Sequence, residues 1–179
     1  QQLQRARMQR LVEDFDAVAP AGLGAVHRDI GIAQQLFRLG VVRRAQGDAD
    51  AHAAVQLLAL HPDNYQALNY VGYTLAEENR DLDRAMTLLV RANEIAPNMS
   101  YIVDSLAWAY YKAGKIDDAL KEIRRAVTLD EHTDASIWEH YGDIAARAGL
   151  KDEARTAYQK AMELKPDNAE ALRQRLSNL

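Results

Sequence analysis

Among the residues of this chain that could bind a metal or transfer protons are five histidines and the aspartates of the segments 48–50 and 81–83. The histidines are His27, His52, His61, His132 and His140. No two of them stand four residues apart or in the HExxH arrangement of helical zinc sites. The segments Asp48-Ala49-Asp50 and Asp81-Leu82-Asp83 lack the glycine and the terminal glutamate of a calcium loop. They suit turns and helix starts instead.

Other sequence features that catalysis or cofactor binding would need are also missing. The chain has no cysteine, which excludes disulfides, thiolate metal sites and a cysteine nucleophile. It has no glycine-rich phosphate loop, and Gly114 and Gly149 have the setting of turn glycines. His140 follows the pattern of a hydrogen-bonded, surface or semi-buried histidine in a helix. We therefore predict a protein that is not an enzyme, with no catalytic residue, no metal site and no cofactor.

The composition is that of a folded protein, and it narrows the classes of partner. Hydrophobic residues make up 48% and charged residues 27% of the 179 residues, and the net charge is −4. No run approaches the roughly 18 apolar residues of a membrane helix, and no block of lysine and arginine indicates a nucleic-acid site. The chain begins at Gln1 rather than Met, which we interpret as a processed protein or a piece of a longer one.

Small residues recur along the chain at a constant spacing. Gly72, Ala107 and Gly142 stand 35 residues apart, and two alanine series follow at steps of 34 and 35 residues: Ala85, Ala119, Ala154 and Ala92, Ala126, Ala161. Apolar residues around them recur at helical spacing, as Leu68, Val71 and Leu75 do. A period near 34 residues with small residues at fixed offsets indicates a solenoid of helical hairpins.

The breaks in this pattern divide the chain into six parts. They are an N-terminal helix and linker (1–25), a degenerate repeat (26–63), three repeats (64–98, 99–133 and 134–167) and a C-terminal capping helix (168–179). The repeat at 26–63 is degenerate because Leu57 replaces a small residue and its turn is about two residues short. From residue 51 onward we predict helices over 51–60, 65–78, 82–96, 99–113, 116–129, 134–148, 151–164 and 168–177.

The repeats resemble the tetratricopeptide-repeat family. The third repeat has its order of large, small and aromatic residues in Trp138, Tyr141, Gly142, Ala154, Tyr158, Ala161 and Pro166. The second departs from it at Glu131. The resemblance is strong over 64–179, weak over 26–63 and absent over 1–25. It implies an all-α, right-handed superhelical array of antiparallel helix pairs with a terminal capping helix. The sequence over 67–149 also resembles the C-terminal part of long bacterial repeat proteins, which are often envelope-associated. This resemblance slightly favours a location in the envelope over one in the cytoplasm.

In proteins with this repeat the first helix of each pair lines the concave surface, where a protein or peptide partner binds. Carried over residue by residue, the resemblance implies a partner-binding groove formed by Asn69, Tyr73, Glu77, Tyr101, Asp104, Trp108, Tyr111, Lys112, Glu139, Asp143 and Arg147. Tyr73, Tyr101, Trp108 and Tyr111 would cluster as aromatic anchors. The alternative is that these aromatic residues pack on each other, on the N-terminal helix or on a second copy of the chain. Tyr70, Tyr110, Trp138 and Tyr141 fit the core better.

The expected function is a non-catalytic scaffold that holds a peptide or helical segment of a partner in this groove. The acidic residues of the groove favour a partner with some positive charge, although a solvated face explains them equally well. The Lys, Arg and Asn clamp by which some family members grip a C-terminal carboxylate is not present. Two alternatives remain open: a regulatory array of a larger enzyme, and a self-assembly module that forms homo-oligomers.

Overall fold

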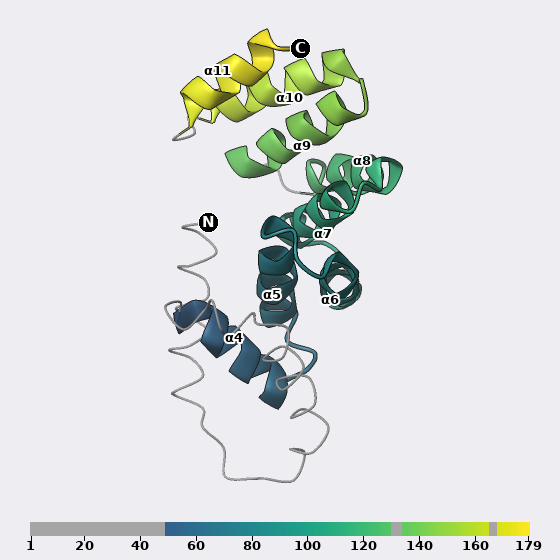
Figure 1. The fold of residues 1–179 in the computed structure, drawn as a ribbon, viewed down its shortest axis with the longest axis vertical. Coiled ribbons are helices and arrows are strands. Elements are labelled where there is room, and N and C mark those ends of the chain that lie inside the picture. The colour runs from purple at the N-terminus through teal and green to yellow at the C-terminus, as the bar shows by residue number, and fades with distance from the viewer. Residues whose placement is uncertain (1–48, 130–133, 165–167) are drawn as a thin grey trace.

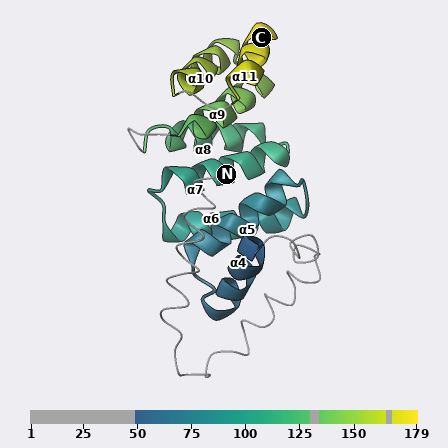
Figure 2. The same ribbon diagram turned by 90° about the vertical axis from the view of Figure 1, so that its left-hand side faces the viewer.

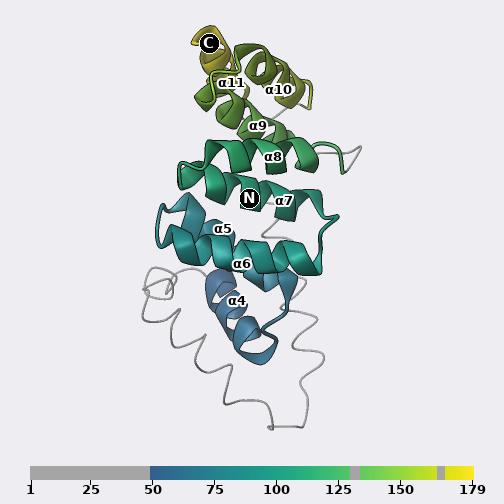
Figure 3. The same ribbon diagram turned by 90° about the vertical axis from the view of Figure 1, so that its right-hand side faces the viewer.

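The computed structural model describes residues 49–129, 134–164 and 168–179, and every regular element in these ranges is a helix. The helices are α4 (Ala49–Leu60), α5 (Tyr65–Glu77), α6 (Leu82–Ile95), α7 (Ser100–Lys112), α8 (Ile116–Ala126), α9 (Ala135–Arg147), α10 (Lys151–Glu163) and α11 (Ala169–Ser177). They follow one another along the long axis, with α4 at one end and α10 and α11 at the other (Figure 1). The side views show the same order (Figures 2 and 3).

Three hairpins form the array: α5 with α6, α7 with α8, and α9 with α10. The first helices also contact one another along the stack, α5 with α7 and α7 with α9. α11 packs on α10 at the C-terminal end. The described residues therefore form an all-helical solenoid, as the residue spacing predicts.

The turns inside the hairpins share one backbone geometry. In the second hairpin Lys115 N–H donates to the Tyr110 carbonyl and Gly114 N–H donates to the Tyr111 carbonyl, with Gly114 at a φ of 76°. This pair of hydrogen bonds is the Schellman motif, which ends a helix with a residue in the left-handed region. Gly149 ends α9 in the same way at a φ of 77°. Asn79 takes the glycine's place after α5, at a φ of 53°.

The starts of several helices are fixed by polar side chains. Asn64 accepts a hydrogen bond from Ala67 N–H at 2.9 Å, and Asp134 accepts one from Ser136 N–H at 2.9 Å. Asp81 accepts one from Arg84 N–H at 3.3 Å, so the segment 81–83 is a helix cap, as predicted. These bonds satisfy backbone donors that the first turn of a helix leaves open.

Small residues allow the two helices of each hairpin to approach closely. A Cβ atom built on Gly72 would lie 2.7 Å from Leu89 Cγ and 3.2 Å from the Ala85 carbonyl oxygen. A Cβ atom on Gly142 would overlap the ring of Tyr158. Ala119 and Ala154, at the position of Ala85 in the later hairpins, are fully buried. The small residues that recur along the sequence thus lie where the two helices of a hairpin meet.

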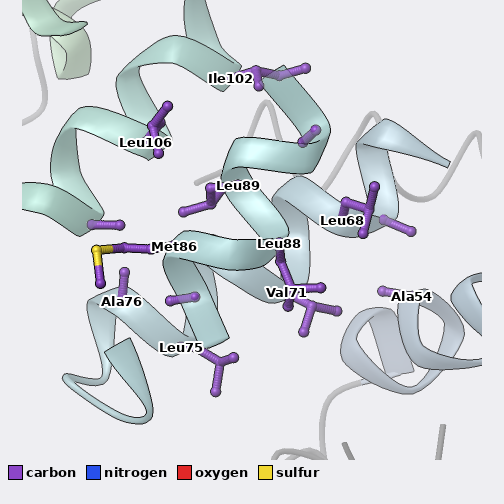
Figure 4. Packing of buried hydrophobic residues seen from close by; sticks show 14 of the residues in the cluster. Ala54, Leu68, Val71, Leu75, Ala76, Met86, Leu88, Leu89, Ile102 and Leu106 are labelled. Atoms are coloured by element: carbon purple, nitrogen blue, oxygen red, sulfur yellow. The ribbon is translucent and has the colours of Figure 1, made fainter. Parts of the chain in front are cut away.

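The core consists of two hydrophobic clusters that share α7. The first joins α4, α5, α6 and one side of α7, where Leu68, Val71, Leu89, Ile102 and Leu106 are buried (Figure 4). The second joins the other side of α7 to α8–α11, and its buried side chains include Val103, Ala107, Leu120, Ile123, Ile137, Ile144, Tyr158 and Leu172. α7 therefore connects the two halves of the described array.

The predicted helices from residue 51 onward are all present, with shifted ends. The largest shift is in α8, which ends at Ala126 instead of residue 129 because Val127, Thr128 and Leu129 form turn bonds. α6 ends at Ile95, two residues before Pro97, as expected for a helix that stops ahead of proline. The predictions for residues 1–48, Glu131 and Pro166 lie outside the described residues.

Candidate partner-binding face

The first helices carry their candidate residues at equivalent positions relative to the small residue of each repeat (Gly72, Ala107 or Gly142). Three residues before it stand Asn69, Asp104 and Glu139. One residue after it stand Tyr73, Trp108 and Asp143. We call the surface that these positions and their helical neighbours form on α5, α7 and α9 the first-helix face.

Trp108 lies at the centre of the first-helix face, but it is only 8% exposed. Its indole Nε1 donates a hydrogen bond of 2.6 Å to the carboxylate of Glu77 on α5. Its ring stacks on Tyr111, with 4.9 Å between centroids, and on His140 of α9, with 4.1 Å. The Lys112 ammonium lies 5.3 Å from the ring centroid, within cation–π range. Trp108 is thus buried below the surface of the face, and its contacts link α5, α7 and α9.

His140 joins α9 to α7. Its Nδ1 atom lies 2.9 and 3.1 Å from the two carboxylate oxygens of Asp104, and both side chains are nearly buried, at 13% and 8% exposure. The Tyr73 ring lies 6.4 Å from the imidazole centroid. Burial alone would lower the pKa of His140, but the charge and hydrogen bond of Asp104, together with Asp143 and Glu139, raise it above 6.5.

Arg175 of α11 joins the capping helix to α9. Its guanidinium lies 2.8 Å from Glu139 and 2.9 Å from Asp143. Asn168 donates a second hydrogen bond to Glu139 at 2.8 Å, and the Tyr158 hydroxyl donates to Asp143 at 2.7 Å. The two carboxylates of α9 therefore share one cation, Arg175, and each accepts a further hydrogen bond within the chain.

Two of these contacts are acid–base pairs with the same sequence spacing. We call this series of pairs the ladder, and each pair of equivalent positions a rung. Asp104 pairs with His140, and Glu139 pairs with Arg175, each with a partner 36 residues later in the chain. The corresponding residues of the first rung are Asn69 and Ser105. The ladder is broken there, because the buried Asn69 Oδ1 has no hydrogen-bond partner and the Ser105 hydroxyl donates to the Tyr101 carbonyl.

The structure places the predicted site residues at different depths. Asn69, Asp104 and Trp108 are buried, Glu77 and Arg147 are exposed, and Tyr73, Tyr111, Lys112, Glu139 and Asp143 are half-buried. Tyr101 is half-buried and packs against the first hydrophobic cluster. The ring of Trp108 contacts Tyr111 and His140, so His140 joins the aromatic group that was predicted to consist of Tyr73, Tyr101, Trp108 and Tyr111.

The tyrosines of the face are held in the neutral form. Burial raises the pKa of Tyr73 far above its usual value, and the charges of Glu77, Asp104 and Glu139 raise it further. Burial and Asp143 also raise the pKa of Tyr111, whereas the nearby Arg147 and Arg175 oppose that rise. A neutral phenol close to two guanidinium groups suits a contact surface better than proton transfer.

Two cations of the face remain available to a partner. Within the described ranges, Lys112 and Arg147 form no ion pair with an acidic side chain. They occupy the same repeat position, in the last turns of α7 and α9, and Tyr111 lies beside Lys112 in the sequence. Tyr111 stacks on Trp108, Lys112 lies over its ring and Arg147 is near Tyr111, so this cation–aromatic group can contact a ligand without any rearrangement.

His140, Arg175 and Asn168 were not predicted as groups of this face. The signal that could have found the first two is the 36-residue spacing from Asp104 and Glu139, an acid and a base one repeat apart. A second concavity was also missed, an open groove on α6 and the α7–α8 turn. Met86, Val90 and Tyr110 line it together with the charged Asp83, Arg91, Glu94 and Lys115.

The described residues offer no metal site and no membrane span. Over residues 49–129, 134–164 and 168–179 the side chains of His, Asp and Glu form no group of three that could hold a metal ion. None of the helices described is long and apolar enough to cross a membrane.

Comparisons with known proteins agree on the repeat. Residues 105–169 match the family model described as Tetratricopeptide repeat. An 87-residue stretch is 36% identical to the TPR repeat-containing protein PA4667 of Pseudomonas aeruginosa. That match covers 49% of this chain, and the chain spans only 14% of the length of the relative.

Solved structures of tetratricopeptide-repeat proteins share the fold. The thermophilic protein TTC0263 of Thermus thermophilus superposes with a TM-score of 0.61 at 19% identity, over 98% of this chain and 89% of that one. A MamA structure gives a TM-score of 0.60 at 20% identity, over 81% of this chain and 79% of its own. The fold is therefore a tetratricopeptide-repeat solenoid, and likeness at such identities concerns the fold alone.

Proposed function

We propose that the chain is a non-catalytic protein-interaction scaffold that binds a peptide or helical segment of a partner on the first-helix face. The observation that carries this proposal is the placement of Tyr111 and Lys112 on the ring of the buried Trp108, with Arg147 near Tyr111. Aromatic and arginine side chains over a packed base are typical of binding hot spots. The tetratricopeptide-repeat fold supports the same function, because it is a fold of interaction scaffolds.

The contacts of the acidic residues change the expected character of the ligand. A free row of carboxylates would favour a basic partner, but Asp104, Glu139 and Asp143 already have partners within the chain. Glu77 accepts the Trp108 indole hydrogen bond. The proposed contact therefore relies on the aromatic surface and on Lys112 and Arg147, rather than on attraction to an acidic groove.

Site-specific photocrosslinking tests the proposal. Tyr111 is replaced by benzoylphenylalanine, which keeps an aromatic ring at the position, and the matched probe replaces Lys121, whose side chain is 80% exposed on α8. We expect Tyr111 probes to crosslink a discrete protein from a bacterial extract, and the Arg147→Ala variant to weaken this crosslink. Equal products from both positions, or none from Tyr111, would refute the proposal.

The 36% identity with a piece of a much longer repeat protein supports a further proposal, that the array works within a longer bacterial protein. The envelope location stays a prediction, and fractionation of cells that produce the full reading frame would test it. If crosslinked products contain only the chain itself, the partner is a second copy and the self-assembly alternative replaces the scaffold.

A further inference from the structure

The contact between α7 and α9 on the first-helix face depends on a titratable group. His140 of α9 reaches Asp104 at 2.9 Å and stacks on Trp108 at 4.1 Å, and both of these residues belong to α7. The neighbouring contact between α5 and α7 contains Asn69 and Ser105 at the equivalent positions, neither of which changes charge. The two contacts therefore respond differently to the loss of a proton.

The titratable groups around His140 lie on α5, α7 and α9. α7 contributes Asp104, and α5 contributes Tyr73 and, through the Trp108 hydrogen bond, Glu77. α9 itself carries Glu139 and Asp143, which Arg175 of α11 holds at 2.8 and 2.9 Å. Glu139 and Asp143 thus have Arg175 as an ion-pair partner, whereas the ion pair of Asp104 is with His140 alone.

We propose that the proton on His140 controls how firmly α9–α11 is held against α4–α8, so that the first-helix face is rigid when His140 is protonated and loosens when it is neutral. The physical reason is the burial of Asp104. With an imidazolium beside it, the carboxylate has a counter-charge and a charge-assisted hydrogen bond. With a neutral imidazole the nearly buried carboxylate loses its counter-charge and keeps one neutral donor, which is costly.

This device regulates the proposed partner site, and its consequence for binding rests on that proposed function. Tyr111 and Lys112 lie on α7, whereas Arg147 lies on α9, so a partner that touches all three must bridge the α7–α9 contact. A rigid contact preorganises the surface, and a loose one adds an ordering cost to binding. We therefore expect partner affinity to fall as the pH rises through the pKa of His140.

Tryptophan fluorescence measures the proton on His140 directly, because an imidazolium stacked on an indole quenches its emission more than a neutral imidazole does. The Trp138→Phe background leaves Trp108 as the single tryptophan, since the sequence has two. We expect the Trp108 emission to drop as the pH is lowered, with a midpoint above 6.5. Asp104→Asn should move the midpoint down, His140→Gln should abolish the step, and the exposed-site control His61→Gln should leave it unchanged.

Distances between spin labels test whether the proton changes the array. The chain has no cysteine, so Thr87→Cys on α6 and Gln159→Cys on α10 give one labelled pair across the α7–α9 contact. Thr87→Cys with Lys121→Cys on α8 gives a matched pair on one side of it. We expect the crossing pair to have a narrow distance distribution at about pH 6 and a broader one at about pH 8.5, and the control pair to stay unchanged.

His140→Gln should give the broad distribution at both pH values, since it cannot be protonated. The proposal is overturned if the parent distributions are the same at both pH values, if His140→Gln follows the parent, or if the fluorescence midpoint lies at or below 6.5. These measurements need no partner. A failed crosslink from Tyr111 at about pH 6 would instead count against the proposed function and leave the response of the array to pH intact.

Discussion

The contacts that α7 makes with its two neighbouring first helices differ in chemistry. Toward α5 it buries Ile102 and Leu106 in the first hydrophobic cluster, next to Asn69 and Ser105. Toward α9 it presents the smaller Val103 and Ala107 together with Asp104 and Trp108, which meet His140. The same repeat position thus contributes an uncharged side chain in one contact and an ion pair in the next.

This difference shows how a repeat protein can combine a rigid contact with a contact that responds to pH. Burial of apolar surface does not depend on pH, whereas a buried ion pair is strong only in one protonation state. Because each repeat contacts only its neighbours, the two contacts can be changed almost independently. Substitutions in one contact should therefore leave the pH response of the other intact.

The largest effect is expected from the apolar contact. Ile102→Ala removes a fully buried side chain between α5 and α7 and should lower the free energy of unfolding by about 2–5 kcal/mol. The loss should be the same at acidic and alkaline pH. Urea unfolding followed by circular dichroism measures it, and the exposed Thr87→Ala serves as the control. A loss that depends strongly on pH would contradict the assignment of this contact as mainly apolar.

Asp104→Asn weakens the polar contact and should act in one pH range. The pKa of His140 is raised in the folded protein, so the pair stabilises the fold fully below the unfolded value near 6.5. That stabilisation is lost as the pH rises through the folded pKa. The variant should therefore lose about 1.5–3 kcal/mol below pH 6.5 and less at alkaline pH.

Urea unfolding of the parent and of Asp104→Asn over a pH series measures this difference. His140→Gln is the companion variant. It removes the other member of the pair and should lower the free energy of unfolding over the same pH range. A difference between parent and variant that grows with rising pH would mean that the sign of the effect is wrong.

Moving the pair into the first rung of the ladder tests whether repeat position alone is sufficient. Asn69→Asp with Ser105→His reproduces Asp104 and His140 one repeat earlier. Each single substitution should destabilise the array, whereas the double variant should recover about 0.5–3 kcal/mol of coupling. A double-mutant cycle at acidic and alkaline pH measures that coupling. Purely additive losses would show that the local packing, rather than the position, makes the pair.

Much of the fold follows from residue spacing because helix ends and close helix contacts depend on local residues. Gly114 and Gly149 adopt the left-handed conformation that ends a helix, and Gly72 and Gly142 stand where a side chain would not fit. Such requirements act within one hairpin and recur at the repeat period. They are therefore visible in a single sequence.

The candidate site was predicted less completely, because it depends on pairs between hairpins. The resemblance to the repeat family placed Trp108 on the first helices, but it did not predict that Trp108 is buried in contact with Glu77 and His140. The C-terminal helix was predicted only as a cap, whereas its Arg175 forms ion pairs with Glu139 and Asp143 of α9. Which cation reaches which acid depends on how the repeats stack, and that geometry is not encoded in the pattern of any one repeat.

The smallest effect is expected on the other side of the array, where Arg124 of α8 pairs with Glu153 of α10 through bonds of 2.7–3.1 Å. Hydrogen bonds from Arg124 and from the Tyr141 hydroxyl lower the pKa of Glu153, so this pair stabilises the fold above the usual carboxyl range and is lost as the pH falls. Both side chains are partly exposed, and Arg124→Ala should therefore cost only about 0.2–1 kcal/mol near neutral pH. Urea unfolding at neutral and acidic pH, with Arg155→Ala as a control of similar exposure, measures the loss. Because the Arg124 pair weakens in acid and the His140 pair weakens in alkali, opposite pH profiles of the two variants would separate the outer contact from the inner one, and parallel profiles would show that both report a single global transition.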